Sequence, residues 1–194
     1  MSGQDNSKTN LTKKIKVEKE DFDEMYLTLD TNNSKKIHNP ANKKMIFDTI
    51  EDYLNQEPPS DVMNFLKEKY KKSNNSIADA ARIKRNRVDT LFKENIVDYR
   101  DGINKISPVD LDKIARAYSS DYLDPEMGLL DVNEEEIDRL MYSVYPKMRL
   151  TDNIFKPYEL TIDDSATIEE FCETYLIKNS ILISTNRGKH SKDD

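Results

Sequence analysis

The sequence of 194 residues contains only four glycines, one cysteine and two histidines, and these scarcities exclude several classes of function. No two glycines lie close together, so the chain cannot form a glycine-rich loop for phosphates or a dinucleotide. The single cysteine, Cys172, excludes an internal disulfide and a cysteine-cluster metal site, and the distant His38 and His190 argue against a zinc enzyme. No apolar run approaches the roughly 18 residues of a membrane span, and no signal-peptide pattern begins the chain. We therefore expect a soluble, cytoplasmic protein that holds no metal and no cofactor.

Charge is distributed unevenly along the chain. The formal net charge of −7 argues, taken alone, weakly against a nucleic-acid partner. However, residues 61–122 carry +3, whereas residues 1–60 and 123–194 carry −2 and −8. Within residues 67–93, nine lysines and arginines stand against three acids. A charge run is often only a solvated face, but a difference in sign between segments is expected where one part of a protein meets an anion.

Shifts in composition divide the chain into five segments. Polar, unpatterned residues at both ends predict disordered tails, and prolines and glycines mark the internal breaks. The predicted segments are a tail over 1–14, an N-terminal extension with one helix over 15–59, a central domain over 60–122, an acidic accessory or dimerisation region over 123–185, and a tail over 186–194.

The extension and the acidic region are predicted to be mostly helical, so the expected fold class is mainly α. Apolar spacing predicts a helix over 42–56, whereas residues 15–30 fit either a short strand or one helical turn. In the acidic region we expect helices that begin at Asn133, through a capping box, and at Thr167. Residues 181–185 are expected to form a short strand.

Four short helices are predicted in the central domain. Ser60 and Ser73 are placed to cap the first two, because their hydroxyls can accept from free backbone N–H groups. The third helix begins near Lys84, and Ser107-Pro108 begins the last, since proline is favoured at the first helical position. A tight junction between the second and third helices is typical of a helix-turn-helix domain.

The apolar spacing of this domain is shared with a known family. The pattern begins with a capping serine, continues with an apolar residue followed by a small one, and has apolar positions at the turn and along the third helix. The residues are Ser73, Ile77, Ala78, Ala81, Ile83, Val88 and Leu91. Over residues 60–120 this pattern resembles the Xre/Cro, or lambda-repressor-like, helix-turn-helix family, and Lys105–Tyr118 is similar to the family's closing helix. The resemblance implies a central lambda-repressor-like domain of four to five helices.

Two features depart from the family pattern. Arg82 occupies the turn position that is usually glycine, so we expect a wider turn. Residues 93–101 form an insertion before the closing helix.

The resemblance implies double-stranded DNA as the partner, with the third helix in the major groove. Its outward positions are expected to contact base edges: Lys84, Arg85, Asn86, Arg87 and Thr90. Phosphate contacts are expected around the start of the second helix and on the far side of the third: Lys71, Lys72, Ser73, Asn74, Asn75, Lys93, Arg100 and Asn104. Because one such helix contacts few bases, we expect a homodimer.

No constellation of residues indicates catalysis, so the chain is not predicted to be an enzyme. Asp163-Asp164 and Glu169-Glu170 fit helix starts, and Cys172 has no histidine near it in the sequence to activate it. The favoured function is a sequence-specific transcriptional regulator of bacterial, phage or plasmid type, acting as a repressor. Two alternatives stay open: a protein-interaction module whose acidic region binds a basic partner, as a phage-encoded inhibitor would, and a DNA packaging or replication accessory protein.

Overall fold

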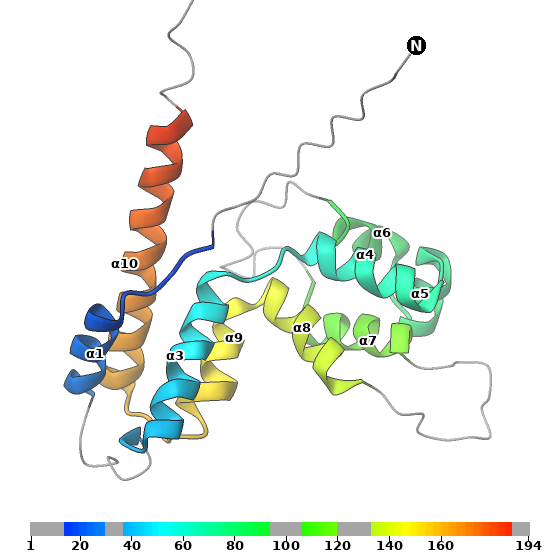
Figure 1. Cartoon of the computed structure of the whole chain (residues 1–194). Coiled ribbons are helices and arrows are strands. Elements are labelled where there is room, and N and C mark those ends of the chain that lie inside the picture. The colour runs from blue at the N-terminus through cyan, green and yellow to red at the C-terminus, as the bar shows by residue number, and fades with distance from the viewer. Residues whose placement is uncertain (1–13, 30–36, 94–105, 120–132, 188–194) are drawn as a thin grey trace, which may run out of the picture.

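The computed structural model describes residues 14–29, 37–93, 106–119 and 133–187, and within these ranges the chain is helical and contains no strand. The prediction of a mainly α fold is therefore confirmed (Figure 1). In chain order the helices are α1 (Lys19–Thr28), α3 (Pro40–Leu54), α4 (Pro59–Tyr70), α5 (Asn74–Ala81), α6 (Arg85–Thr90), α7 (Pro108–Ser119), α8 (Glu134–Val144), α9 (Pro146–Leu150), the π-helical turn η3 (Thr151–Phe155) and α10 (Ile162–Arg187).

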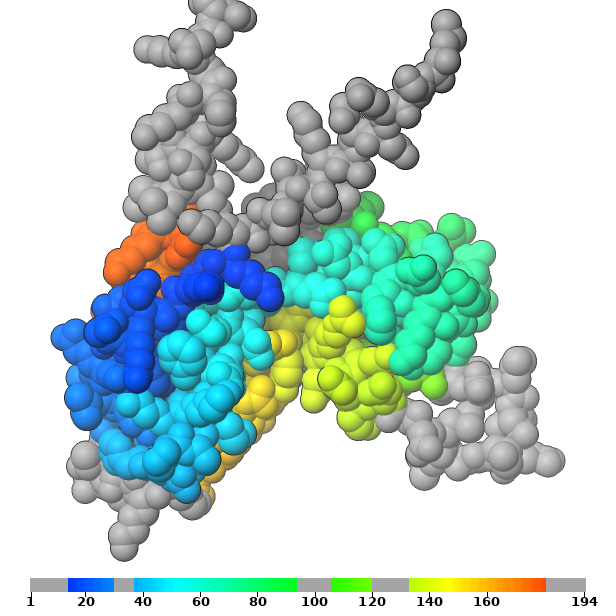
Figure 2. Space-filling model, viewed as in Figure 1, coloured from blue at the N-terminus to red at the C-terminus, as the bar shows by residue number. Residues whose placement is uncertain are grey.

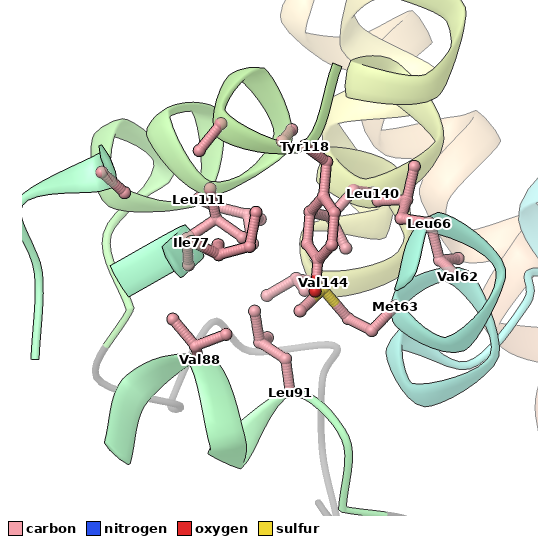
Figure 3. Close-up of a cluster of buried hydrophobic side chains, with 14 of the residues drawn as sticks. Val62, Met63, Leu66, Ile77, Val88, Leu91, Leu111, Tyr118, Leu140 and Val144 are labelled. Atoms are coloured by element: carbon pink, nitrogen blue, oxygen red, sulfur yellow. The ribbon is translucent and has the colours of Figure 1, made fainter. Parts of the chain in front are cut away.

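The helices pack around two separate hydrophobic cores. The first core lies among α4, α5, α6, α7 and α8, and Figure 3 shows ten of its labelled side chains converging between these helices: Val62, Met63, Leu66, Ile77, Val88, Leu91, Leu111, Tyr118, Leu140 and Val144. The second core joins α1 and α3 to the C-terminal helices, with central members Phe22, Ile46, Ile50, Ile154, Ile168 and Cys172. Figure 2 shows the two groups of helices as adjoining masses.

The cores are not contiguous in the sequence. Helix α8, which composition places in the acidic segment 123–185, completes the first core, where Leu140 is fully buried. Helices α9 and α10 complete the core of the N-terminal extension instead. The acidic segment therefore divides at Tyr145, between α8 and α9: the part before it packs in the first core and the part after it packs in the second.

Several helix boundaries follow directly from local sequence. The Ser73 hydroxyl accepts from the backbone N–H of Ser76 at 3.1 Å, as expected of the cap of α5. The Asn133 side chain accepts from the N–H of Glu136 at 3.3 Å at the start of α8. Pro108 is the first residue of α7, as predicted. These three starts depend on residues within one turn of each helix.

Three local predictions are wrong, each because a helix extends further than expected. Residues 15–30 form neither a strand nor a single turn, since α1 runs over ten residues. Helix α10 begins at Ile162, where the Thr161 hydroxyl accepts from the N–H of Asp164 at 3.1 Å, and not at Thr167. The expected strand 181–185 belongs to the same helix, because no proline or glycine interrupts the chain between Glu159 and Arg187.

Ser60 does not cap its helix. Helix α4 begins at Pro59, two residues earlier than a Ser60 cap would place it, and the fixed φ of proline suits the first helical position. The Ser60 side chain lies within the first turn and is buried. The position of the helix is predicted correctly, but its capping residue is not.

The connection from α5 to α6 is tight in spite of its arginine. Arg82 adopts the left-handed conformation, with φ 55° and ψ 45°. Its N–H donates to the carbonyl of Asp79 at 3.2 Å, and the N–H of Ile83 donates to the carbonyl of Ala78 at 3.0 Å. This pair of bonds is a Schellman motif, which normally uses glycine. The expected widening therefore does not occur, and only residues 82–84 separate the two helices.

Candidate nucleic-acid interface

The first core fixes the position of α6 from one side. Val88 and Leu91 are buried, with at most 1% of either residue exposed, and Ile77 of α5 is fully buried in the same cluster. Ala78, also buried, gives α5 a small side chain in the core that it shares with α6. Because Val88, the apolar residue of this six-residue helix, and Leu91, which follows the helix, face the core, the polar residues of α6 lie on the outer side.

The residues at the start of α6 form an exposed polar edge. Lys84 is the N-cap residue, and Arg85 and Asn86 follow it at the first two helical positions, all exposed. Within the described part of the chain, the side chains of Lys84 and Asn86 have no hydrogen-bond or ion-pair partner. Arg82 is exposed at the preceding turn. The structure thus brings three predicted base contacts together and adds an arginine that sequence analysis assigned only to the turn.

Two predicted base contacts are engaged with the protein. The Arg87 Nη1 atom lies 2.6 Å from the Oδ2 atom of Asp110, in the first turn of α7. The Thr90 hydroxyl donates to the carbonyl of Asn86 at 2.7 Å, one turn earlier in the same helix. Both side chains therefore make intramolecular contacts that compete with any contact to a base.

The predicted phosphate contacts differ in how far they are available to a partner. Lys71 is exposed and ends α4 in the left-handed conformation, and Asn75 is exposed in the first turn of α5. Lys72 instead donates to the carbonyl of Ala117 at 3.0 Å, near the end of α7. The remaining candidates are Ser73, which caps α5, Asn74, which binds Asp89, Lys93, which is exposed, and Arg100 and Asn104, which lie outside the described residues.

Other cations of the basic segment face the first core's own helices. Lys69 of α4 pairs with Glu136 of α8, and Tyr70 donates to the same carboxylate at 2.5 Å. The bond with Glu136 raises the pKa of Lys69. Lys67 lies 5.3 Å from the ring centroid of Phe92. Contacts between helices therefore engage part of the positive charge of this segment, whereas Lys71, Arg82 and Lys84 are exposed and have no ion-pair partner among the described residues.

One functional candidate was underrated by sequence analysis. Asp89, in the last turn of α6, has no role among the sequence predictions. Its carboxylate accepts from the Asn74 side-chain amide at 2.7 Å and lies 3.3 Å from the Arg85 Nε atom. The four-residue spacing from Arg85 signals one of these contacts in the sequence, whereas the contact with Asn74 depends on how α5 and α6 cross.

The described residues contain no group of three or more histidine, cysteine or acidic side chains placed to hold a metal ion. Cys172 is buried in the second core, and this burial raises the pKa of its thiol to about 12. Asp163 and Asp164 occupy the first turn of α10, where acids suit the helix dipole. Within the described ranges no helix combines the length and the apolar character that crossing a membrane requires.

Comparison of this chain with protein-family models, with curated proteins and with solved structures finds no match. A function is therefore inferred from the site geometry and from the spacing of residues 60–120.

Proposed function

We propose that the protein is a sequence-specific DNA-binding transcriptional regulator, in which α5 and α6 act as a helix-turn-helix and α6 enters the major groove. One observation carries the proposal: the edge formed by Arg82, Lys84, Arg85 and Asn86 is exposed, cationic and polar. A short helix pinned by Val88 and Leu91 presents it. Side chains at the N-terminal end of such a helix are the ones that reach base edges.

The exposed residues suit different parts of the duplex. The Arg85 guanidinium matches the O6 and N7 acceptors of guanine, and the Asn86 amide matches the N6 and N7 groups of adenine. Lys71 and Asn75, near the N-terminus of α5, suit backbone phosphates, which fix register without selecting sequence. Arg87, because it is bound to Asp110, is assigned to holding α6 against α7.

The remaining parts of the proposal follow from this mode of binding. One recognition helix contacts too few bases for a unique site, so the protein acts as a homodimer on two half-sites one helical turn apart. It represses transcription in the cytoplasm of a bacterium, or on behalf of a phage or plasmid, and it catalyses no reaction. Helices α1 and α10, on the second core, carry a net negative charge, which we assign to contact with a protein partner.

The test begins with DNA selected by the wild-type protein from a random-sequence duplex pool and footprinted with the same protein. We expect a salt-dependent footprint with two related half-sites. Arg85→Ala and Asn86→Ala should each lose about 1–3 kcal/mol of discrimination at the bases they contact.

Lys44→Ala provides a matched control. Lys44 is an exposed lysine of α3, in the second core's group of helices, and it pairs with Asp48 at 2.5 Å within the same helix. The Lys44→Ala substitution should leave the footprint unchanged. If the wild-type protein binds no duplex in a salt-dependent manner, the proposal is wrong, and a protein-interaction role for the acidic surface replaces it.

A further inference from the structure

Asp89 connects the first residues of the two helices that form the proposed DNA-binding unit. Its Oδ1 atom accepts from the side-chain amide of Asn74, the first residue of α5, at 2.7 Å. Its Oδ2 atom lies 3.3 Å from the Nε atom of Arg85, the first residue of α6. Arg85 remains 62% exposed and Asp89 38% exposed, so the pair lies at the surface beside the proposed interface.

The energetics of α6 alone do not explain an acid at this position. Asp89 lies in the last turn of the helix, where the partial charge of the helix end is negative and repels a carboxylate. A basic residue that precedes an acid by four positions is also the weaker order for a helical ion pair. An exposed pair of this kind contributes little to stability. Asp89 is therefore poorly placed as a local stabiliser of its own helix.

Asp110 provides a contrast within the same unit. It also binds an arginine of α6, Arg87, at 2.6 Å, but it lies in the first turn of α7, where a carboxylate is favoured. Its side chain is only 18% exposed. The contact between Asp110 and Arg87 thus stabilises the packing of α6 on α7, whereas that between Asp89 and Arg85 acts on an exposed arginine that is free of α7.

We propose that Asp89 is a specificity-determining positioning residue, which aligns Arg85 and Asn74 for DNA and lowers binding to non-cognate sequences. This inference rests on the proposed function. Pairing through Nε leaves both Nη groups of Arg85 to donate to guanine O6 and N7. The carboxylate also keeps a negative charge beside the guanidinium, which opposes its use as a general phosphate contact. At a cognate base pair, the hydrogen bonds of Arg85 to guanine offset the repulsion between the Asp89 carboxylate and the DNA. At a non-cognate base pair, the repulsion remains and these hydrogen bonds are not formed.

Asp89→Asn is the sharpest test, because the amide oxygen can still accept from Asn74 while the charge is lost. The probes are the duplex selected by the wild-type protein and a random-sequence duplex of equal length, each titrated over a range of salt concentrations. We expect tighter binding to the random duplex, a salt slope steeper by about one phosphate contact, and a ratio of specific to random affinity about tenfold lower.

Asp79→Asn is the matched control. Asp79 is an exposed acid of α5, and its side chain has no hydrogen-bond or ion-pair partner among the described residues. Asp79→Asn removes the same charge from the same group of helices. It should therefore tighten binding to both duplexes by a similar factor and leave the ratio of specific to random affinity unchanged. In an Arg85→Ala background, Asp89→Asn should no longer change the ratio.

The outcomes separate the two levels of the argument. If the wild-type protein shows no salt-dependent binding to either duplex, the proposed function fails and this inference fails with it. If the wild-type protein discriminates between the duplexes but Asp89→Asn behaves as Asp79→Asn does, only the role of Asp89 is wrong. Thermal unfolding of each variant, followed by circular dichroism, should show the same transition as the wild type.

Discussion

The two cores use their charged residues in different ways. Around the first core, acids join helices to one another: Glu136 of α8 binds Lys69 of α4, and Asp110 of α7 binds Arg87 of α6. Around the second core, residues 162–177 of α10 contain five acids and no cation, and α1 contains four acids and one lysine. Two of these acids are paired, Asp23 with Lys43 and Glu169 with Lys147, but α1 and this stretch of α10 keep a net negative charge, whereas cations are exposed around α5 and α6. The same chain therefore offers surfaces suited to partners of opposite charge.

A short junction joins the two groups of helices. The Glu57 carboxylate, in the α3–α4 connection, accepts from Arg139 of α8 through two bonds of 2.6 and 2.7 Å. The guanidinium of Arg139 also lies 4.4 Å from the ring centroid of Phe65 in α4. Helix α9 packs against both α3 and α8. The cores are thus close neighbours with separate interiors.

The largest expected effect comes from opening one core at a time. Leu140 and Ile168 are both fully buried, in the first and the second core respectively. Leu140→Ala and Ile168→Ala should each cost about 2–5 kcal/mol of unfolding free energy, measured by denaturant titration. The rate at which a thiol reagent labels Cys172 under native conditions should rise in Ile168→Ala and stay near the wild-type rate in Leu140→Ala. Equal acceleration in both variants would show that the two cores open as one unit.

These two cores also show where prediction from sequence stops. Starts set within one turn were predicted correctly, as at Ser73 and Asn133, because the capping group and its N–H partner are neighbours in the chain. The pairing of α8 with α4 was not, because apolar periodicity identifies the buried face of a helix but not the helix that covers it. The strand expected over 181–185 is wrong because α10 continues through these β-branched residues, and no proline or glycine ends the helix before Arg187.

The candidate site shows the same limit. Asn86 is exposed, as its two-residue spacing from the buried Val88 predicts, and Lys84 is exposed at the N-cap of α6. The ion pair of Arg87 was not predicted, because its partner, Asp110, lies 23 residues away and in another helix. For surface cations in general, the sequence predicts exposure well, while the choice between a free charge and an ion pair depends on long-range packing.

A second prediction uses alkaline pH to destabilise the second core. Burial keeps the Cys172 thiol protonated in the folded state, with a pKa raised from 9.0 to about 12. In the unfolded chain the thiol ionises from about pH 9, so above that pH the unfolded state binds fewer protons and the free energy of unfolding falls as pH rises. The stabilisation is complete below pH 9 and is lost on approaching pH 12. Between pH 8 and pH 10, the free energy of unfolding of the wild-type protein should fall by about 1 kcal/mol more than that of Cys172→Ala.

Denaturant titrations of both proteins at several pH values provide the measurement for this second prediction. Tyr118→Phe is the matched control in the first core. Burial raises the pKa of Tyr118 from 10.0 to about 12, so ionisation of this tyrosine in the unfolded chain lowers the free energy of unfolding only above pH 10. Identical slopes for wild-type protein and Cys172→Ala below pH 10 would contradict the prediction and would place the thiol in contact with water.

A third prediction separates two tyrosines that line the first core. The Tyr118 ring is fully buried, and its hydroxyl has no hydrogen-bond partner among the described residues (Figure 3). The Tyr145 hydroxyl donates to the carbonyl of Ile106. Tyr145→Phe should therefore cost about 1 kcal/mol, whereas Tyr118→Phe should be neutral or stabilising, because it removes an unsatisfied polar group. Thermal unfolding measures both, and a loss of more than 1 kcal/mol in Tyr118→Phe would reveal a partner for its hydroxyl.

The smallest expected effect compares two left-handed residues, one from each group of helices. Arg82, with φ 55°, closes α5, and Glu159, with φ 50°, precedes α10. Glycine adopts this conformation without the steric cost of a Cβ atom, so Arg82→Gly and Glu159→Gly should each stabilise the protein by roughly 0.5–1 kcal/mol. Their effects on DNA should differ. Arg82→Gly removes a cation from the proposed interface and should weaken binding to the selected duplex with a shallower salt slope, while Glu159→Gly should leave the slope unchanged. A gain in stability together with a loss of DNA affinity, confined to Arg82→Gly, would assign the strained arginine to binding and not to folding. An unchanged salt slope in both variants would remove Arg82 from the interface.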